Sequence, residues 1–373
     1  MRRGGAYDRF RMMLEAFLER GCEVHCLSLT PIQIYDVRYR NHVLRIPARM
    51  QETFAAKLVV LFLFPLYAVW IGYLEEIDLF VAFGPLYAFL QSVSKWILRK
   101  PMVTLIRLDL LQDSKTSKLV TTDCLGPVIE YVGLISSDHI LSTNVNTQQE
   151  VKKLLRNRRT TRVDVLFNDI QTTQTNFSWR NDFPVRERFR IPKEARIIVT
   201  AGLITPRKNL DVVLVSLSQV ATEDLFLIIA GDPGSKADFR YRKHLEKMTQ
   251  ELGLMNRVIF TGWIKKEELW KIFRVSDLFI LPSKSEGMPN VMLEALGCDL
   301  PCLGSNIPGI KDILKYEELM FDPLDEKKLA NKLGRVFSDH QLFSQMKRLC
   351  QERKTAFIFD WKEKVFEMVT GGF

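Results

Sequence analysis

The chain has 373 residues, of which 47% are hydrophobic and 26% charged. This balance excludes a largely disordered chain, and the length is comfortable for two folded domains. The formal net charge of +9 favours an anionic partner, such as a phosphorylated substrate, an acidic membrane face or nucleic acid. Zinc-finger spacings, a homeodomain pattern and an aromatic–basic RNA signature are all absent from the sequence, so we predict no nucleic-acid partner.

The beginning of the chain resembles the second half of a strand–turn–helix unit. Gly4 and Gly5 form a glycine-rich turn before a predicted helix at Tyr7–Glu19, which Gly21 ends. In a doubly wound sheet such a turn follows the central strand, yet only three residues precede it. We therefore expect the natural polypeptide to begin upstream of Met1, or another segment to fill this position, since a missing central strand leaves two strand edges unpaired. A single, fully paired first sheet would contradict this expectation.

The six cysteines are scattered and form no CxxC pair, which favours a reducing compartment. Cys22/Cys26 and Cys298/Cys302 have CxxxC spacing, but no cluster of histidines accompanies them. Buried small hydrophobic residues are therefore the preferred interpretation, and we predict no metal site. The first residues also lack the apolar core of a signal peptide. We expect a cytoplasmic protein, with a peripheral position on the inner face of the membrane left open.

Two segments of the sequence are candidates for contact with a membrane. The seventeen residues Leu58–Leu74 are uncharged, and three interpretations are open: a helix buried in the first domain, a helix partly in the membrane interface, and a true span. A span would interrupt a βαβ unit. Pro65 predicts a kink in whichever helix forms. The segment Lys152–Arg162 is basic, and is either a solvated helix end or a site for anionic lipid headgroups.

Short apolar, β-branched runs alternate with helical stretches along the chain, which predicts βαβ units and parallel sheets. A polar segment, Gln171–Glu194, separates two sets of strands and is interpreted as a linker. The fold class is therefore α/β, with two Rossmann-like, doubly wound domains facing across a cleft, and ligands are expected beyond the carboxyl ends of the strands. The predicted strands are Glu23–Leu29, Asp78–Phe83, Met102–Ile106, His139–Ser142, Val163–Phe167, Ile197–Thr200, Leu225–Ile229, Val258–Phe260, Leu278–Leu281 and Pro301–Leu303.

The strongest functional signal is the string SEGMPNVMLEAL at Ser285–Leu296, directly after a predicted strand. Gly287 permits a sharp turn, and Pro289 suits the first helical position. The amides and dipole at the start of the helix then attract a diphosphate. Glu294, one turn into this helix, can accept two hydrogen bonds from a vicinal diol such as a ribose, while Glu286 in the loop can hold hydroxyls of a sugar. Acidic residues near helix starts are also ordinary caps, so the complete string carries the interpretation.

This string resembles the E-x7-E motif of the retaining GT-B glycosyltransferases of family 4, the glycosyl transferases group 1. The resemblance covers the second half of the chain, and the first half matches loosely through Gly4–Gly5 and Asn168–Asp169. It implies a GT-B fold with an acceptor-side domain at residues 1–180, a nucleotide-sugar-binding domain at 181–355, and a helix at 356–373 that crosses back to the first domain. The similar segments are Ala201–Asn209, Ala230–Gly234, Val258–Trp263, Ile307–Asp312 and Phe359–Trp361.

The resemblance also implies roles for individual residues. Lys208 would neutralise the donor diphosphate, which needs a cation where no metal is bound. The family's usual Arg after Gly202 is replaced by Leu203, and Arg207 could supply that charge. The family's acceptor-side His is also absent, and Arg107 or Asp109 could face the sugar or be merely structural. Glu286 would be a further catalytic residue, and Gly4, Gly5 and Arg107 would lie on the acceptor side. The donor-binding residues would be Gly202, Gly231, Trp263, Ile264, Gly287, Met288, Pro289, Asn290, Val291 and Glu294.

The function implied is retaining, metal-independent transfer of a hexose-type sugar from a nucleotide-diphosphate sugar to a glycan or polyprenyl-linked acceptor, in cell-surface polysaccharide synthesis. The segments Leu58–Leu74 and Lys152–Arg162 would meet a membrane surface. The alternative is a catalytically degenerate GT-B protein that serves as a binding or scaffold subunit. The missing first strand, Leu203 and Arg107 in place of the family's residues favour it, and the presence of Glu286, Glu294 and Lys208 disfavours it. A Rossmann oxidoreductase is excluded, because no G-x-G-x-x-G follows a strand with an acidic partner downstream.

Overall fold

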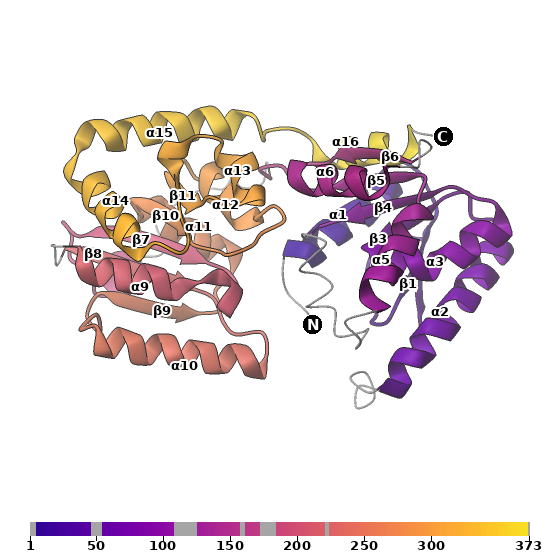
Figure 1. The fold of residues 1–373 in the computed structure, drawn as a ribbon, viewed down its shortest axis with the longest axis horizontal. Coiled ribbons are helices and arrows are strands. Elements are labelled where there is room, and N and C mark those ends of the chain that lie inside the picture. The colour runs from indigo at the N-terminus through magenta and orange to yellow at the C-terminus, as the bar shows by residue number, and fades with distance from the viewer. Residues whose placement is uncertain are drawn as a thin grey trace. The chain divides into compact units, whose positions relative to one another are not determined.

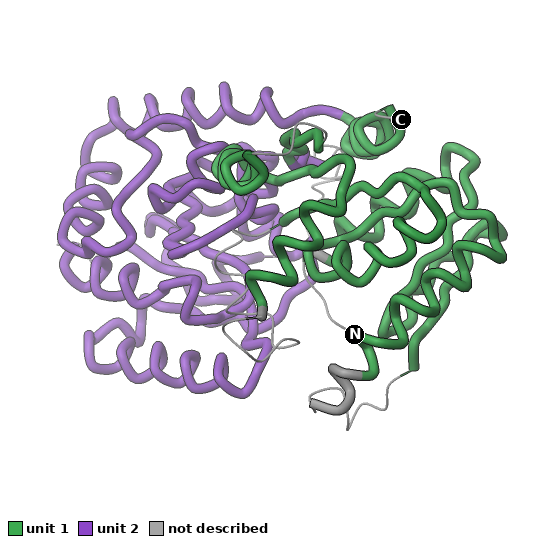
Figure 2. Tube along the Cα trace, turned by 45° about the vertical axis from the view of Figure 1, so that its right-hand side comes forward, with its two compact units in different colours: residues 1–167, 360–373 green, residues 168–359 purple. Residues whose placement is uncertain are grey.

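The computed structural model describes residues 5–45, 54–107, 125–156, 161–171, 184–220 and 224–371. The chain forms two compact units: unit 1 is residues 1–167 with 360–373, and unit 2 is residues 168–359 (Figure 2). Unit 2 begins at Asn168, because this residue and Ile170 bond within it. The backbone N–H of Asn168 donates to Met288 Sδ at 3.0 Å, and that of Ile170 to the Phe357 carbonyl at 2.7 Å.

Unit 1 contains two separate parallel sheets (Figure 1). Strand β1 (Val24–Ser28) pairs with β2 (Tyr39–Val43), while β3 (Phe80–Phe83), β4 (Met102–Ile106), β5 (His139–Ser142) and β6 (Arg162–Val165) pair in chain order. In the part of unit 1 that the structure describes, no strand joins the two sheets. The first sheet is therefore not a single paired sheet, and the expectation that a further strand fills the central position stays a prediction.

The helices of unit 1 cover these strands. Helix α16 packs on α1, where the Phe17 and Phe366 rings lie 5.3 Å apart and Lys362 Nζ lies 3.4 Å from Glu15 Oε2. The first helix begins at Gly5, two residues before its predicted start. The helices of this unit are α1 (Gly5–Glu19), α2 (Phe54–Leu74), α3 (Pro85–Leu98), α5 (Leu125–Ile135), α6 (Val145–Leu154) and α16 (Trp361–Thr370).

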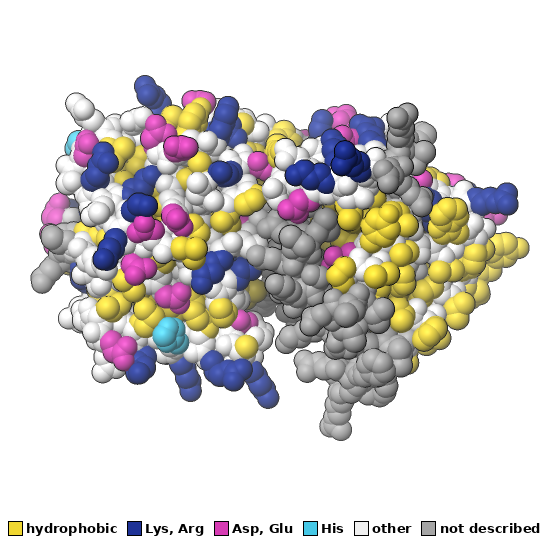
Figure 3. All heavy atoms as spheres, viewed as in Figure 1, with side chains coloured by type: hydrophobic (Ala, Val, Ile, Leu, Met, Phe, Trp, Pro, Cys, Tyr) yellow, Lys and Arg dark blue, Asp and Glu magenta, His cyan; other side chains and the backbone are white. Residues whose placement is uncertain are grey.

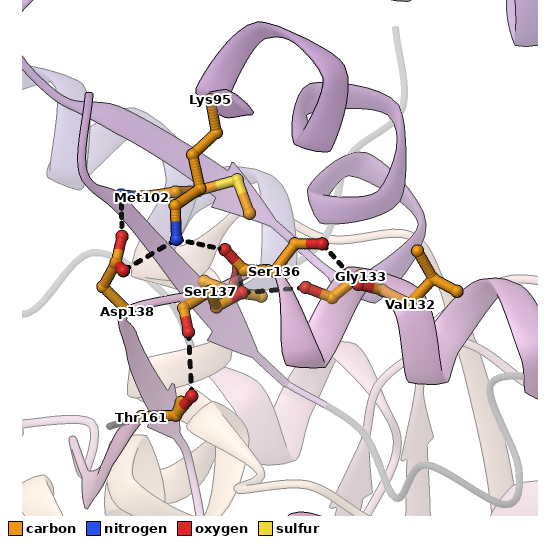
Figure 4. A network of polar contacts seen from close by, with 9 residues as sticks. Lys95, Met102, Val132, Gly133, Ser136, Ser137, Asp138 and Thr161 are labelled. Carbon is orange, nitrogen blue, oxygen red and sulfur yellow. Dashed lines mark hydrogen bonds and ion pairs between the residues drawn. The ribbon is translucent and has the colours of Figure 1, made fainter. Parts of the chain in front are cut away.

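A polar network fastens two of these helices to the central strands of the four-stranded sheet (Figure 4). Lys95 of α3 donates from Nζ to Asp138 Oδ1 at 2.7 Å and to the Ser136 carbonyl, just after α5, at 2.6 Å. The other Asp138 oxygen accepts from the backbone N–H of Met102, at the start of β4, at 2.8 Å. One carboxylate thus satisfies a lysine and a strand end together, which fixes α3 and α5 against the sheet.

Unit 2 is built on a six-stranded parallel sheet in the order β12-β11-β10-β7-β8-β9. All residues of β8 and β10 are buried, and each buried aliphatic side chain stabilises the fold by roughly 1.5–3 kcal/mol. The chain runs outward from β7 through β8 and β9 and then returns to its other side at β10, so the strand order reverses there. The strands are β7 (Arg196–Ala201), β8 (Leu225–Ala230), β9 (Val258–Gly262), β10 (Leu278–Leu281), β11 (Cys302–Ser305) and β12 (Met320–Phe321).

Helices lie on both faces of this sheet (Figure 1). The first, α8, lies within the segment predicted to be a linker. In doubly wound sheets, ligands bind beyond the carboxyl ends of the strands where the order reverses, which here is the edge shared by β7 and β10. The helices are α8 (Val185–Arg188), the 3-10 turn η1 (Pro206–Lys208), α9 (Leu210–Gln219), α10 (Lys236–Glu251), α11 (Lys266–Val275), α12 (Asn290–Gly297), α13 (Pro308–Leu314), η2 (Glu317–Leu319), α14 (Glu326–Ser338) and α15 (His340–Thr355).

Candidate active site

Two loops meet at the carboxyl ends of β7 and β10. The loop after β7 enters the 3-10 turn η1, which carries Arg207 and Lys208. The loop after β10 carries Ser283 to Pro289 and leads into α12. The backbone N–H of Lys284 donates to the Arg207 carbonyl at 2.9 Å. The strand reversal therefore brings together two motifs that lie far apart in the sequence.

Glu286 is the centre of this meeting point. Its Oε1 accepts hydrogen bonds from Lys208 Nζ at 2.7 Å and Ser283 Oγ at 2.7 Å, and lies 2.9 Å from Arg207 Nη1. Arg207 Nη1 also donates to the carbonyl of Ser285. The Glu286 side chain is only 8% exposed, yet it is surrounded by cations and hydroxyls and not by apolar core. The site thus has the composition expected of a binding site for polar groups.

The electrostatics of this cluster follow from those contacts. Burial alone raises the pKa of Glu286, but the charges of Lys208 and Arg207 and the hydrogen bonds from Lys208 and Ser283 outweigh it, so the pKa lies below the ordinary value of 4.5. Glu286 is therefore ionised at neutral pH. Two cations and one carboxylate leave this group with one net positive charge, beside the amino end of α12. Both features favour an anion at this edge of the sheet.

The helix that carries the second acidic residue begins where the sequence predicts. Helix α12 starts at Asn290, and Pro289 is its N-cap residue instead of its first helical residue, because its backbone is extended with φ −74° and ψ 108°. Glu294 lies one turn into the helix. Its side chain is 16% exposed, and its Oε1 lies 3.6 Å from Nζ of Lys266, at the start of α11. A carboxylate held in this way can accept both hydroxyls of a ribose.

Asn168 fixes the start of α12, a role that the sequence does not reveal. Its side chain is buried, and Nδ2 donates to Asn290 Oδ1 at 2.7 Å and to the Met288 carbonyl at 3.3 Å. The sequence separation is about 120 residues in each case, so no local pattern signals this contact. Only the loose match of Asn168–Asp169 to the family singled out this position.

The glycines at the strand ends have a structural reason. Gly231, after β8, has φ 145°, and a Cβ added to it would lie 1.9 Å from the carbonyl oxygen of Gly202 after β7. Only glycine permits this close approach. Nearby, the backbone N–H of Trp263 donates to Asp232 Oδ2 at 2.8 Å, while the Trp263 side chain is 47% exposed. Ile264 is half-buried and Leu203 is exposed. A base-binding role for Trp263 and Ile264 stays a prediction.

The acceptor-side candidates lie in unit 1. Arg107 follows β4, and its Cζ lies 5.6 Å from the centre of the Phe83 ring. Burial lowers the pKa of Arg107 to about 10, and the charge of Arg9 adds to this effect. Gly5 begins α1, whereas Gly4 and Asp109 lie outside the described residues. Roles of these residues toward an acceptor stay predictions.

The structure brings together a larger set of site residues than the sequence identified. Within unit 2 it gathers the candidate residues Arg207, Lys208 and Glu286 near the start of α12, with Ser283, Asn168 and Lys266 in contact with members of this group. Ser283 stands three residues before Glu286 and could have been noted from that spacing alone. Lys266 carries no sequence signal beyond its position at a helix start. In the described parts of the chain, no three His, Cys, Asp or Glu side chains gather as a metal site would require.

This fold and site define a class of protein: two Rossmann-like α/β units, one of which presents cations, a buried carboxylate and a helix start at its strand reversal. Residues 182–353 match the family described as glycosyl transferases group 1. The fold is also that of HepE from Anabaena in a complex with UDP, with a TM-score of 0.78 and 15% identity over 99% of this chain and 97% of that one. WaaG, a glycosyltransferase involved in lipopolysaccharide biosynthesis, gives 0.71 and 15% over 100% and 97%. The match to the group 1 glycosyltransferases thus covers residues 182–353, and the fold of the chain is GT-B.

The matches to curated proteins cover smaller shares of both chains than the structural matches do. An uncharacterized glycosyltransferase of Methanocaldococcus jannaschii is 24% identical over 57% of this chain and 54% of its own length. The mannosyltransferase WbdA of Escherichia coli is 26% identical over 50% of this chain and 22% of its own length. The chain thus spans about half of the first relative and less of the second.

Proposed function

We propose that the protein is a retaining glycosyltransferase that moves a hexose-type sugar from a nucleotide-diphosphate sugar to a glycan or lipid-linked acceptor. Unit 2 would hold the donor and unit 1 the acceptor. The observation that carries this proposal is the Glu286 cluster, in which Lys208 and Arg207 converge on one carboxylate beside the amino end of α12. The match of residues 182–353 to the group 1 glycosyltransferases and the UDP held by the similar HepE structure support it.

The proposed reaction is a transfer with retention of configuration, supported by the charges of the site. The bond between the anomeric carbon and the diphosphate oxygen breaks as the acceptor hydroxyl forms a new bond to that carbon on the same face. The hydroxyl proton passes to the departing phosphate oxygen. Lys208, Arg207 and the α12 amides would stabilise the charge that develops on the diphosphate, Glu286 would position the sugar through its hydroxyls, and Glu294 would bind the ribose.

The acceptor and setting are proposed from the relatives and from unit 1. Relatives that match this chain include WbdA and a galactosyltransferase whose name specifies a diphosphoundecaprenol acceptor. A polyprenyl-linked sugar in cell-surface polysaccharide synthesis is therefore the acceptor class to test first. In the described residues no helix is long and apolar enough to cross a membrane. We propose a peripheral membrane position, reached through α2 and the basic residues of α6.

The test combines nucleotide binding with turnover. UDP, GDP and ADP are screened by thermal shift, since a ligand that binds the native state raises the melting temperature, and the matching sugar donors are then tested for transfer or hydrolysis. Glu294→Gln should weaken nucleotide binding strongly. Lys208→Ala should lower kcat more than nucleotide affinity, by roughly 10²–10³-fold for loss of one stabilising group.

The control is Lys284→Ala, which removes an exposed lysine from the same loop and should leave both readouts unchanged. Wild-type turnover by the Glu294 and Lys208 variants would contradict the proposal. Nucleotide binding without turnover of any donor would favour the degenerate, scaffold alternative, which the exposed Leu203 in place of the family's Arg keeps open.

A further inference from the structure

Three neighbouring helices of unit 1 expose an unusual amount of apolar surface. Helix α3 packs against both α2 and α5. Figure 3 shows hydrophobic side chains gathered over these helices, with few charged side chains among them. We term this surface the apolar face, and its members are between 41% and 73% exposed: Phe62, Leu63, Leu66, Trp70, Tyr73 and Leu74 from α2, Val93, Trp96 and Ile97 from α3, and Val128 and Tyr131 from α5.

Helix α2 is apolar on both of its sides. Val60, Phe64, Ala68 and Ile71 are buried against unit 1, and this side is sufficient to hold the helix on the domain. A helix at a water-exposed surface normally carries polar residues on its outer side. The outer side of α2 carries Phe and Leu instead of polar residues. This composition favours an apolar environment, and no described residue of the chain covers these side chains.

Charged side chains stand at the edges of this face: Glu75 and Glu76 directly after α2 and Arg99 directly after α3 are exposed. Lys95 lies on α3 beside Trp96, but its Nζ turns to Asp138 and the Ser136 carbonyl, and its side chain is only 17% exposed (Figure 4). Exposed basic residues stand instead on and just after α6, at Lys152, Lys153 and Arg156. In Figure 3, Lys and Arg side chains gather over α6 next to the hydrophobic side chains over α5. A cationic strip thus borders the apolar face.

The order of residue types along the face distinguishes a lipid from a protein partner. The C-terminal ends of α2 and α3 lie together, because a Cβ on Gly72 would lie 2.5 Å from Leu98 Cδ1. Trp70, Tyr73 and Trp96 lie toward this end, together with Leu74 and Ile97, whereas Phe62 and Leu66 lie toward the other. Trp and Tyr favour the headgroup level of a bilayer and Phe and Leu its hydrocarbon. A protein interface of this size would instead need a hydrogen bond for every 100–200 Å² or so.

We propose that the apolar face inserts into one leaflet of a membrane that contains anionic lipids, with the basic strip of α6 on the headgroups. This inference rests on the proposed function and deepens it, because a lipid-linked acceptor would be reached from the membrane surface. The two can fail separately, since vesicle binding and nucleotide-sugar turnover in solution are measured independently.

The experiment is flotation of the full chain with phosphatidylcholine vesicles that contain or lack phosphatidylglycerol. The variant Phe62→Ser/Leu66→Ser/Trp96→Ser should lower the partition constant at least about a hundredfold, since burial of each such side chain corresponds to roughly a factor of ten or more. The matched control Phe239→Ser/Leu324→Ser removes exposed apolar residues from unit 2 and should bind vesicles like the wild type.

A second measurement does not depend on how well the triple variant folds. Vesicles should shift the tryptophan fluorescence of the wild type to shorter wavelength, and Trp70→Phe/Trp96→Phe should abolish the shift while retaining flotation. Absence of wild-type flotation, or equal flotation by the triple variant, would overturn the proposal. A third result would also overturn it: the wild type does not bind vesicles and is a dimer by light scattering, while the triple variant is a monomer. The face would then bind a second copy of the chain.

Discussion

Replacing Gly309 with alanine tests whether the backbone of the Glu286 loop positions the site. Gly309 lies on α13, and a Cβ added there would lie 2.1 Å from the carbonyl oxygen of Gly287 and 2.3 Å from that of Glu286. Real Cβ atoms keep at least 3.0 Å from such atoms. The obstacle is backbone and not a flexible side chain, so the loop and α13 must separate by about 0.9 Å.

The expected loss of rate and of stability follows from the contact that this loop makes with Lys208. Glu286 Oε1 lies 2.7 Å from Lys208 Nζ, and a displacement of nearly 1 Å breaks or distorts this contact. A misplacement of about 1 Å in an active site can cost roughly 10²-fold in rate. Overpacking costs about 1–3 kcal/mol in stability, or roughly 2–4 °C in melting temperature for each kcal/mol in a domain of this size.

The assay measures kcat/KM with the preferred nucleotide sugar, and the thermal shift produced by the nucleotide alone. Gly334→Ala on α14 is the matched control, because its Cβ would meet no atom within 4 Å. That variant should be stabilised by roughly 0.5–1 kcal/mol, as expected for alanine in a helix, with unchanged kinetics. A Gly309→Ala protein with wild-type kcat/KM would refute the argument that this close approach positions the loop.

Three further predictions concern the pKa of Glu286, the hydrogen bonds of Asn168 and the effect of a metal chelator. Burial alone would raise the pKa of Glu286, but Lys208 and Arg207 lower it. Its contribution to stability is therefore present above the ordinary value of 4.5 and is lost as pH falls through the lower folded-state pKa, so Glu286→Gln should flatten the melting-temperature curve below pH 4.5. Asn168→Ala leaves the buried side of α12 without two donated hydrogen bonds; we expect a loss of about 1–3 kcal/mol and a smaller nucleotide-induced thermal shift. Finally, excess EDTA should leave turnover unchanged, because the proposed mechanism stabilises the diphosphate with Lys208 and Arg207 instead of a metal. Loss of turnover in EDTA that Mg²⁺ or Mn²⁺ restores would contradict this.

The sequence predicts the buried strands well because their patterns are unambiguous. Strands β4, β5 and β10 begin and end where predicted, and every residue in them is buried. Strand β10 is an uninterrupted apolar run, LFIL, whereas β4 (MVTLI) contains one polar residue and β5 (HILS) begins and ends with one. Strand β2 was not predicted because its five residues, YRNHV, are mostly polar and none is fully buried. Strand β12 has only two residues, which is too short for a periodic signal.

The site could be predicted in its parts but not in its assembly. The start of α12 and the importance of Lys208 and Glu286 follow from local residues and from the resemblance to a family. The hydrogen bond between these two side chains does not, because 78 residues separate them and only the reversal of strand order brings β7 beside β10. The same holds for Asn168, whose partners are about 120 residues away.

The number of cations around Glu286 argues for a ligand that is itself negatively charged. A buried carboxylate is costly unless it is paired, and one cation with hydrogen bonds is enough to compensate it. Lys208 provides that cation, and Ser283 provides a further hydrogen bond. Arg207 is then a second cation at the same carboxylate oxygen, more than that single charge requires, although it also donates to the Ser285 carbonyl; its side chain is 37% exposed. An arginine retained there, one residue before the lysine and beside the amino end of α12, is explained if a diphosphate completes the charge balance. Arg207→Ala should therefore leave the melting temperature of the protein alone nearly unchanged and reduce the additional stabilisation given by the nucleotide; a large loss of stability without any change in nucleotide binding would show that Arg207 belongs to the fold instead.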